Sequence, residues 1–99
     1  MSSTTDTWGS DMEIVRYHTD TGHTSALIVE RGRKWMHIIP MESHAVRIRR
    51  VRLSEERNMS PLQYKGKPYP VTRALRHFKR HAKDFGITKT AQRALRRSK

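Results

Sequence analysis

The chain of 99 residues contains no cysteine, which excludes disulfide bonds and thiolate metal ligands. It also lacks an apolar run of membrane-spanning length, and its first residues, MSSTTDTWGSD, have neither the basic nor the apolar region of a secretory signal. Acidic residues are scarce, since nine Asp and Glu stand against 21 Lys and Arg. These absences lead us to expect a soluble, cytoplasmic protein with no membrane partner.

The hydrophobic fraction is only 34%, so the core that this short chain can form is small. The apolar residues nevertheless cluster in periodic segments, which favours one compact domain over a disordered chain. Residues 1–11 are the exception, because they are rich in Ser, Thr and Asp, and we expect them to form a disordered N-terminal tail.

Positive charge increases along the chain. The net charge is −4 over residues 1–30 and +5 over residues 31–64, and it reaches +11 over residues 65–99, where Asp84 is the only acid. Self-repulsion of this size exceeds what solubility requires, so it indicates a polyanionic partner. Nucleic acid is the first expectation and an acidic protein surface is the second.

Four segments alternate apolar and polar residues in the manner of short β-strands, at 12–18, 24–30, 34–40 and 45–53. In the first of them, Val15 and Tyr17 are predicted on one face, with Met12 and Ile14 on the other. Because the central segments are apolar on both faces, the sequence predicts a four-stranded antiparallel meander that is strongly bent, like a small barrel.

The segment AVRIRRVRL, residues 45–53, breaks its own alternation at Arg49-Arg50. Its apolar residues have one parity before this pair and the other parity after it. A β-bulge here would return all of them to one face and place the arginines outside. The alternative is an unbulged strand that passes from one packed face to the other. We favour the bulge, because bulges suit bent sheets.

From Pro70 onward the apolar residues recur every three or four positions, which predicts an amphipathic helix over about 70–85. Gly86 suits the end of this helix, with a turn at 86–87, and Thr88 suits the cap of a second helix over about 88–97. The predicted apolar stripe of the first helix comprises Val71, Ala74, Leu75, Phe78, Ala82 and Phe85.

The predicted fold class is therefore α+β, with a sheet followed by two C-terminal α-helices in one compact domain. The predicted parts are a tail (1–11), an antiparallel sheet (12–58), a loop rich in Pro and Gly (59–69) and a basic helical segment (70–99).

Residues 81–97, HAKDFGITKTAQRALRR, resemble the helix-turn-helix of phage Cro and repressor-type DNA-binding proteins. The local order AKDFGI is especially close to the Cro pattern, and the segment departs from the family at His81 and Gln92, where apolar residues are usual. The matching residues are Ala82, Phe85, Gly86, Ile87, Ala91 and Leu95. In such a motif the small residue permits close packing, the glycine forms the turn, and the apolar residues hold the helices together.

This resemblance implies that the second helix is a recognition helix for the major groove of duplex DNA. Its base-facing candidates are Thr88, Lys89, Thr90, Gln92 and Arg93. The candidates for phosphate contacts on the helices are Arg73, Arg76, Lys79, Arg80, Lys83, Arg96 and Arg97. A second strip of phosphate contacts is expected on the sheet, from Arg47, Arg49, Arg50 and Arg52 with Arg31, Arg33 and Lys34 in a neighbouring turn.

Catalytic and metal-binding patterns are not expected. His77 and His81 have the i, i+4 spacing of a metal-binding pair, but no Glu accompanies them in a metalloprotease arrangement and their helix is densely cationic. The sequence has no Gly-rich phosphate loop and no nucleophile motif, so we expect neither an enzyme nor a cofactor.

The predicted function is nucleic-acid binding, with duplex DNA preferred over RNA, in a small phage-type or accessory regulator. Two alternatives stay open. One is an RNA-binding module in which bases stack on Trp35, Tyr64 and Tyr69 beside the sheet arginines. The other is a basic interaction factor that docks on an acidic host protein. A homodimer would suit palindromic DNA, but the sequence does not set the oligomeric state.

Overall fold

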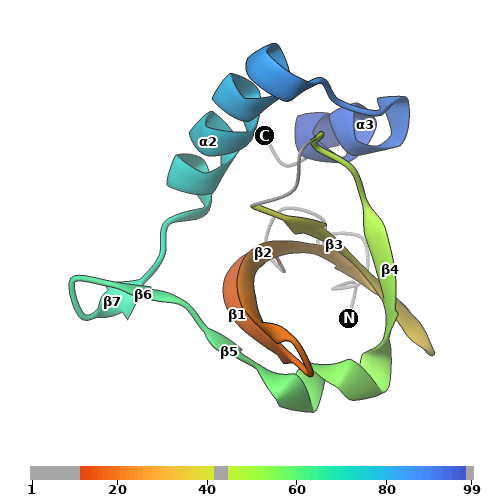
Figure 1. Cartoon of the computed structure of the whole chain (residues 1–99), viewed down its shortest axis with the longest axis vertical. Helices are drawn as coiled ribbons and strands as arrows, with labels where there is room; N and C mark the ends of the chain where they lie inside the picture. Colours follow the sequence, from red (N-terminus) through yellow and green to blue (C-terminus); the bar gives the residue numbers. More distant parts are fainter. Residues whose placement is uncertain (1–11, 42–44, 98–99) are drawn as a thin grey trace, which may run out of the picture.

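An antiparallel sheet carries both C-terminal helices on one of its faces (Figure 1). The computed structural model describes residues 12–41 and 45–97, so the tail predicted at 1–11 lies outside the described residues. The elements are β1 (Glu13–Thr19), β2 (Gly22–Arg31), β3 (Trp35–Pro40), β4 (Arg49–Arg52), the 3-10 helix η2 (Leu53–Asn58), β5 (Met59–Pro61), β6 (Gln63–Tyr64), β7 (Lys67–Pro68), α2 (Val71–Phe85) and α3 (Lys89–Arg97).

The main sheet has five strands in the order β4-β3-β2-β1-β5, and all its pairings are antiparallel. The predicted α+β class and the meander of the first four strands are confirmed. The fifth strand was missed, because β5 is only three residues long and ends at Pro61, inside the predicted loop. It joins the sheet by pairing with β1, where Tyr17 opposes Met59.

The prediction of a strongly bent, barrel-like sheet is wrong, because the sheet is open and β4 and β5 are its two edges. Both faces are nevertheless covered, each by a different element. The cluster on the helix side comprises Met12, Ile14, Leu27, Val29, Ile39, Met41, Val46, Ala74, Phe78 and Ala91. The cluster on the η2 side comprises Val15, Tyr17, Ala26, Ile28, Met36, Ile38 and Val51, with Leu53 and Met59 packed against it. The predicted division of β1 between two faces is thus confirmed.

The predicted bulge in residues 45–53 is also wrong, since β3 and β4 pair in unbroken register. Val46 and Ile48 contact the helix-side cluster, whereas Val51 and Leu53 contact the η2-side cluster. The chain therefore passes from one packed face to the other, which was the alternative interpretation. The physical reason is that the open sheet buries both of its faces, so its edge needs apolar residues of both parities. A register shift occurs instead in β2, against β3.

The connection between α2 and α3 is Gly86-Ile87-Thr88. Gly86 has a φ of 94°, a conformation that side chains disfavour, and its amide donates to the Ala82 carbonyl at 2.8 Å. The amide of Val46 donates to the Gly86 carbonyl at 2.9 Å, and the amide of Thr88 donates to the Val46 carbonyl at 3.0 Å. These backbone bonds fasten the turn to the segment before β4 and thereby fix α3 against the sheet.

Thr88 caps α3, because its hydroxyl accepts a hydrogen bond from the Ala91 amide at 3.2 Å. Thr88→Ala is expected to lower the free energy of unfolding by about 1 kcal/mol, since the amide loses its partner at the first turn of the helix. Thr88→Ser keeps the hydroxyl and is expected to stay close to the wild type. Urea unfolding of the three proteins measures the difference, and an equal loss in both variants would contradict the cap.

Tyr17 links β1 to η2, since its hydroxyl donates to the Glu55 carboxylate at 2.8 Å. Burial, and then this hydrogen bond, raise the pKa of the Tyr17 hydroxyl, while the same bond lowers the pKa of Glu55. Tyr17→Phe is expected to lower the free energy of unfolding by about 1 kcal/mol at neutral pH, the net value of one hydrogen bond.

This difference should depend on pH. A raised tyrosine pKa stabilises the fold fully below its ordinary value of 10.0, and the contribution is lost as the pH rises through the folded value. A lowered carboxyl pKa stabilises the fold above its ordinary value of 4.5 and is lost as the pH falls. The gap between wild type and Tyr17→Phe should therefore narrow at both ends of a pH series of urea unfolding. A gap of constant size would contradict this assignment.

Candidate nucleic-acid interface

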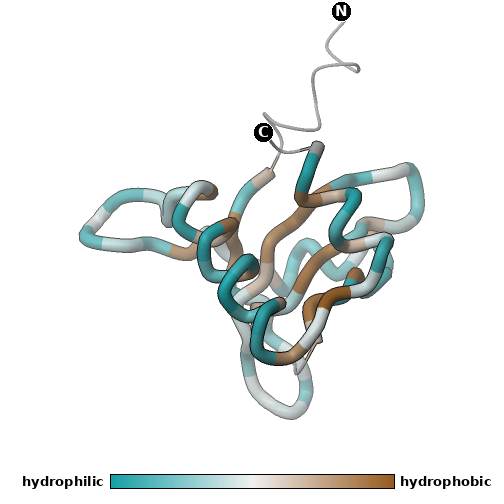
Figure 2. The backbone as a smooth tube through the Cα atoms, turned by 90° about the horizontal axis from the view of Figure 1, so that it is seen from above, coloured by the Kyte–Doolittle hydropathy of each residue, from teal (hydrophilic) through white to brown (hydrophobic). Residues whose placement is uncertain are grey.

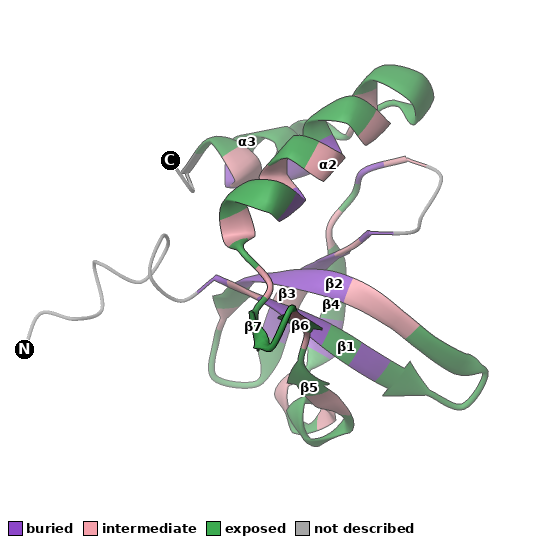
Figure 3. Cartoon of the chain, turned by 90° about the vertical axis from the view of Figure 1, so that its left-hand side faces the viewer, coloured by how far each residue is buried: buried purple, intermediate pink, exposed green. Residues whose placement is uncertain are grey.

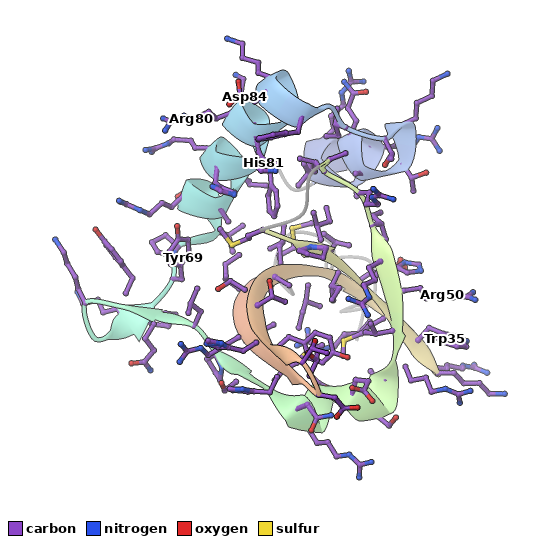
Figure 4. All side chains as sticks on the ribbon, viewed as in Figure 1. Trp35, Arg50, Tyr69, Arg80, His81 and Asp84 are labelled. Carbon is purple, nitrogen blue, oxygen red and sulfur yellow. The ribbon has the colours of Figure 1, made fainter. Side chains whose placement is uncertain are left out.

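The outer face of α2 is basic because its apolar residues recur at helical spacing and bind it to the sheet. Ala74 and Phe78 are buried in the helix-side cluster, which turns the opposite side of the helix to solvent (Figure 3). In Figure 4, Arg80 projects away from the sheet. All five basic residues of α2 are exposed, namely Arg73, Arg76, Lys79, Arg80 and Lys83.

The outer face of α3 is basic for the same reason. Ala91 and Ala94 are buried, whereas Lys89, Arg93 and Arg96 are exposed, and Arg93 and Arg96 also line the grooves on the two flanks of the helix. Seen from above, the helices are largely hydrophilic and the strands beneath them are hydrophobic (Figure 2). We use the name helical basic face for the exposed cations of both helices, which are Arg73, Arg76, Lys79, Arg80, Lys83, Lys89, Arg93 and Arg96.

The base-facing candidates do not share one face of α3. The Thr88 hydroxyl is engaged in the cap. Thr90 and Arg93 line a groove between α3 and the sheet, together with His37 and Ile48. Gln92 lines a different groove, between α2 and α3. Lys89 and Arg93 stay together, one helical turn apart and both exposed.

The groove between α2 and α3 has an apolar floor and a basic rim, and its volume is about 370 Å³. Leu75, Phe78, Ala82, Ile87 and Leu95 form the floor, with Arg76, Lys79 and Arg96 around them. Gln92 lies at this open groove and is exposed, which explains how a polar residue is accommodated where the Cro family has an apolar one.

The sheet arginines do not form one strip. Arg50 and Arg52 of β4 pair with His37 and Trp35 of β3, respectively. Their guanidinium carbons lie 4.3 and 5.2 Å from the Trp35 ring centroid. Arg49 opposes Ile38, a residue of the η2-side cluster, so it projects from the other face of the sheet. Arg47 precedes β4 and is exposed.

Arg31 has a structural role. Its guanidinium donates to Glu13 at 2.7 Å and to Glu56 at 2.9 Å, which ties β2 to β1 and η2. These hydrogen bonds raise its pKa in spite of its burial, which acts in the opposite direction. Arg33 and Lys34, the other cations expected in this strip, are exposed in the turn that follows β2.

The hairpin of β6 and β7 extends the basic surface in a way that sequence reasoning missed. It projects beside α2 (Figure 1), and Lys65 and Gly66 form its two-residue turn with φ angles of 55° and 79°. The Arg73 guanidinium carbon lies 4.6 Å from the Tyr64 ring centroid, so the hairpin contacts the start of α2. The segment YKGK, a Lys-Gly pair between two short strands, is the signal that predicts this turn.

Comparisons with protein-family models, curated proteins and solved structures found no match. The resemblance of residues 81–97 to the Cro helix-turn-helix therefore stays a prediction, and the function has to be argued from the geometry above.

The histidine pair of α2 packs against its surroundings. The His77 and His81 rings stack at 5.5 Å, and a His77 ring nitrogen, Nε2, lies 2.9 Å from the Met41 carbonyl oxygen. In the described part of the chain, no three His, Asp or Glu side chains form a group that could hold a metal ion. Among the same residues, no helix combines the length and the apolar character needed to cross a membrane.

Proposed function

We propose that the protein binds nucleic acid, with duplex DNA preferred, through the helical basic face. The observation that carries the proposal is the charge of the two helices: residues 71–97 hold nine Lys and Arg against one acid, Asp84. Every one of these cations whose side chain is described is exposed. A duplex presents one phosphate charge per about 1.7 Å of its axis, so such a surface releases many counterions when it binds.

The length of α2 suits a duplex. Arg73 and Lys83 are ten residues apart, which corresponds to about 15 Å along the helix axis. The major groove is about 12 Å wide, so cations at the two ends of α2 can contact the phosphates on both of its borders. These contacts would position the protein without selecting a sequence.

The contribution of α3 to sequence recognition rests on Lys89 and Arg93. Both are exposed near the start of the helix, and Lys and Arg are the side chains that most often contact guanine in the major groove. Thr90 lies in the groove between α3 and the sheet, and Gln92 lies in the groove between α2 and α3. Thr88 caps the first turn of the helix. We propose that Lys89 and Arg93 face base edges and that the cations of α2 bind phosphates.

Fluorescence anisotropy with labelled duplex DNA, single-stranded DNA and duplex RNA, over about 50 to 200 mM salt, tests the proposal. We expect duplex DNA to bind most tightly, with an affinity that falls steeply as the salt concentration rises. Tighter binding of duplex RNA or of a single strand would overturn the preference for duplex DNA. Absence of binding to all three at about 150 mM salt would overturn nucleic-acid binding itself.

The groove between α2 and α3 favours a second candidate function. Its apolar floor and basic rim fit an acidic amphipathic segment of a partner protein. Docking of this kind predicts weak affinity for DNA at physiological salt and a discrete protein partner, so the same salt series separates the two functions.

A further inference from the structure

A pocket on the sheet, apart from the helical basic face, combines an exposed indole with several cations. It has a volume of about 470 Å³ and is lined by Glu30, Arg33, Lys34, Trp35, His37 and Arg50. We call it the Trp35 pocket. Trp35 and Arg50 lie at the side of the sheet in Figure 4, far from Arg80 on α2.

The exposure of Trp35 distinguishes it from the other large apolar residues of the sheet. Its relative exposure is 37%, whereas Met36, Ile38 and Ile39, its neighbours in β3, are at most 1% exposed. The Arg50 and Arg52 guanidinium groups lie over the indole ring, and the part of the ring that stays exposed offers a stacking surface for a planar base. Stacking on aromatic side chains is how proteins hold unpaired bases.

The cations around the indole are held in place before any ligand arrives. The Arg50 and Arg52 guanidinium carbons lie 4.3 and 5.2 Å from the ring centroid, which is the geometry of cation–π contacts. Ordering these long side chains in advance reduces the entropy that a ligand must remove on binding.

The turn before β3 brings two more cations to the ring. The Gly32 amide donates to the Trp35 carbonyl at 2.8 Å, and a Cβ at Gly32 would lie 3.1 Å from that same oxygen. This tight turn keeps Arg33 and Lys34 on the wall of the pocket. Stacking surface and cations thus lie within one concavity.

We propose that the Trp35 pocket binds an unpaired nucleotide of a single strand, with the base stacked on Trp35 and the phosphate held by Arg33, Lys34 and Arg50. Glu30 is the only acid among the lining residues, and its carboxylate lies 3.2 Å from His37 Nδ1. That carboxylate can accept a hydrogen bond from an N–H group of a base, and thymine offers one at N3. None of the residues that line the Trp35 pocket belongs to the helical basic face, and the proposal does not require that face to bind a duplex.

The surroundings of the pocket favour a single strand of nucleic acid over a free nucleotide as its ligand. Glu30 and His37 also line the neighbouring groove, where they meet Thr90 and Arg93 of α3. The pocket and this groove therefore adjoin at Glu30 and His37. A chain of nucleotides can extend from Trp35 toward Arg93, whereas a single nucleotide occupies only one of the two hollows.

The test uses a Trp8→Phe variant, in which Trp35 is the only tryptophan. Its fluorescence is followed as oligo(dT) of about eight nucleotides, thymidine 5′-monophosphate or blunt duplex DNA is added. Quenching that saturates with oligo(dT) and is much weaker with the mononucleotide supports the proposal. If the mononucleotide binds as tightly as oligo(dT), the pocket does not select a strand over a free nucleotide. If neither oligo(dT) nor the mononucleotide quenches the fluorescence, the pocket is not a nucleotide site.

Variants of the full chain separate the pocket from the fold. Trp35→Leu is expected to weaken oligo(dT) binding, measured by anisotropy, by about 10-fold or more, while Trp35→Phe keeps most of the affinity. Phe85→Leu is the matched control, because Phe85 is also an exposed aromatic residue, at 54%, and lies outside the pocket. An equal loss in Phe85→Leu, or no loss in Trp35→Leu, would overturn the assignment. Blunt-duplex affinity should not change in Trp35→Leu, so failure here is distinguishable from failure of the helical basic face.

Discussion

Arg76→Gln combined with Arg80→Gln is expected to weaken duplex DNA binding by about 30-fold at about 150 mM salt. Both side chains are exposed near the middle of α2, and each is proposed to bind a phosphate. Loss of two phosphate contacts should also reduce the slope of log affinity against log salt by about two, because each contact contributes about 0.9. Anisotropy over the salt series measures both quantities.

The matched control is Arg16→Gln combined with Arg57→Gln, which removes the same charge from β1 and η2. Both residues are exposed, and η2 lies at the end of the molecule opposite α2 (Figure 1). The control pair should keep nearly all of the affinity and the salt slope. If both pairs weaken binding equally, the net charge of the chain and not the helical basic face governs association, and the proposed site is wrong.

The basic helices could be predicted from the sequence because the information is local. Apolar residues at spacings of three and four define the buried stripe of α2, and the cations between them then fall outside that stripe. Phe85 is the exception, since it was predicted in the stripe but is 54% exposed, with its ring packed on His81 at 4.6 Å. It is the last residue of α2, where the helix has run beyond the sheet.

The parts that could not be predicted depend on contacts between distant segments. The short strand β5 exists only because β1 offers it an edge, and nothing in Met59–Pro61 alone indicates a strand. The switch in alternation within residues 45–53 fits a bulge if only one face of the sheet is buried. It fits a strand that passes from one packed face to the other if both faces are buried. Which of these holds depends on η2, because its first residue, Leu53, and the residue that follows it, Met59, pack on the second face.

The orientation of α3 is the non-local fact that matters most for the candidate site. The hydrogen bonds of Val46 to Gly86 and Thr88 fix which side of α3 meets the sheet. That choice places Thr90 and Gln92 in two different grooves and leaves Lys89 on the outer face. The resemblance of the segment to a helix-turn-helix carries no information about this docking, because the sheet is not part of the motif.

Phe78→Ala is expected to lower the free energy of unfolding by about 3–5 kcal/mol, the largest effect on stability of any single change considered. Phe78 is 1% exposed and is the largest fully buried side chain among the described residues, in the cluster that joins α2 to the sheet. The free energy of unfolding of a domain of this size is only about 5–15 kcal/mol in total. The midpoint of thermal unfolding should therefore fall by roughly 15 °C or more. Differential scanning calorimetry measures this fall.

Phe85→Ala supplies the control, because it makes the same substitution in the same helix at a residue that is 54% exposed. Phe85→Ala should lower the free energy of unfolding far less than Phe78→Ala, because folding buries little apolar surface at position 85. An equal loss in both variants would mean that α2 is not held to the sheet through Phe78. At a temperature where Phe78→Ala is still folded, its cations are unchanged, so the salt slope of duplex binding should match the wild type. A changed slope would show that the cations of α2 act only when the helix is held rigidly against the sheet.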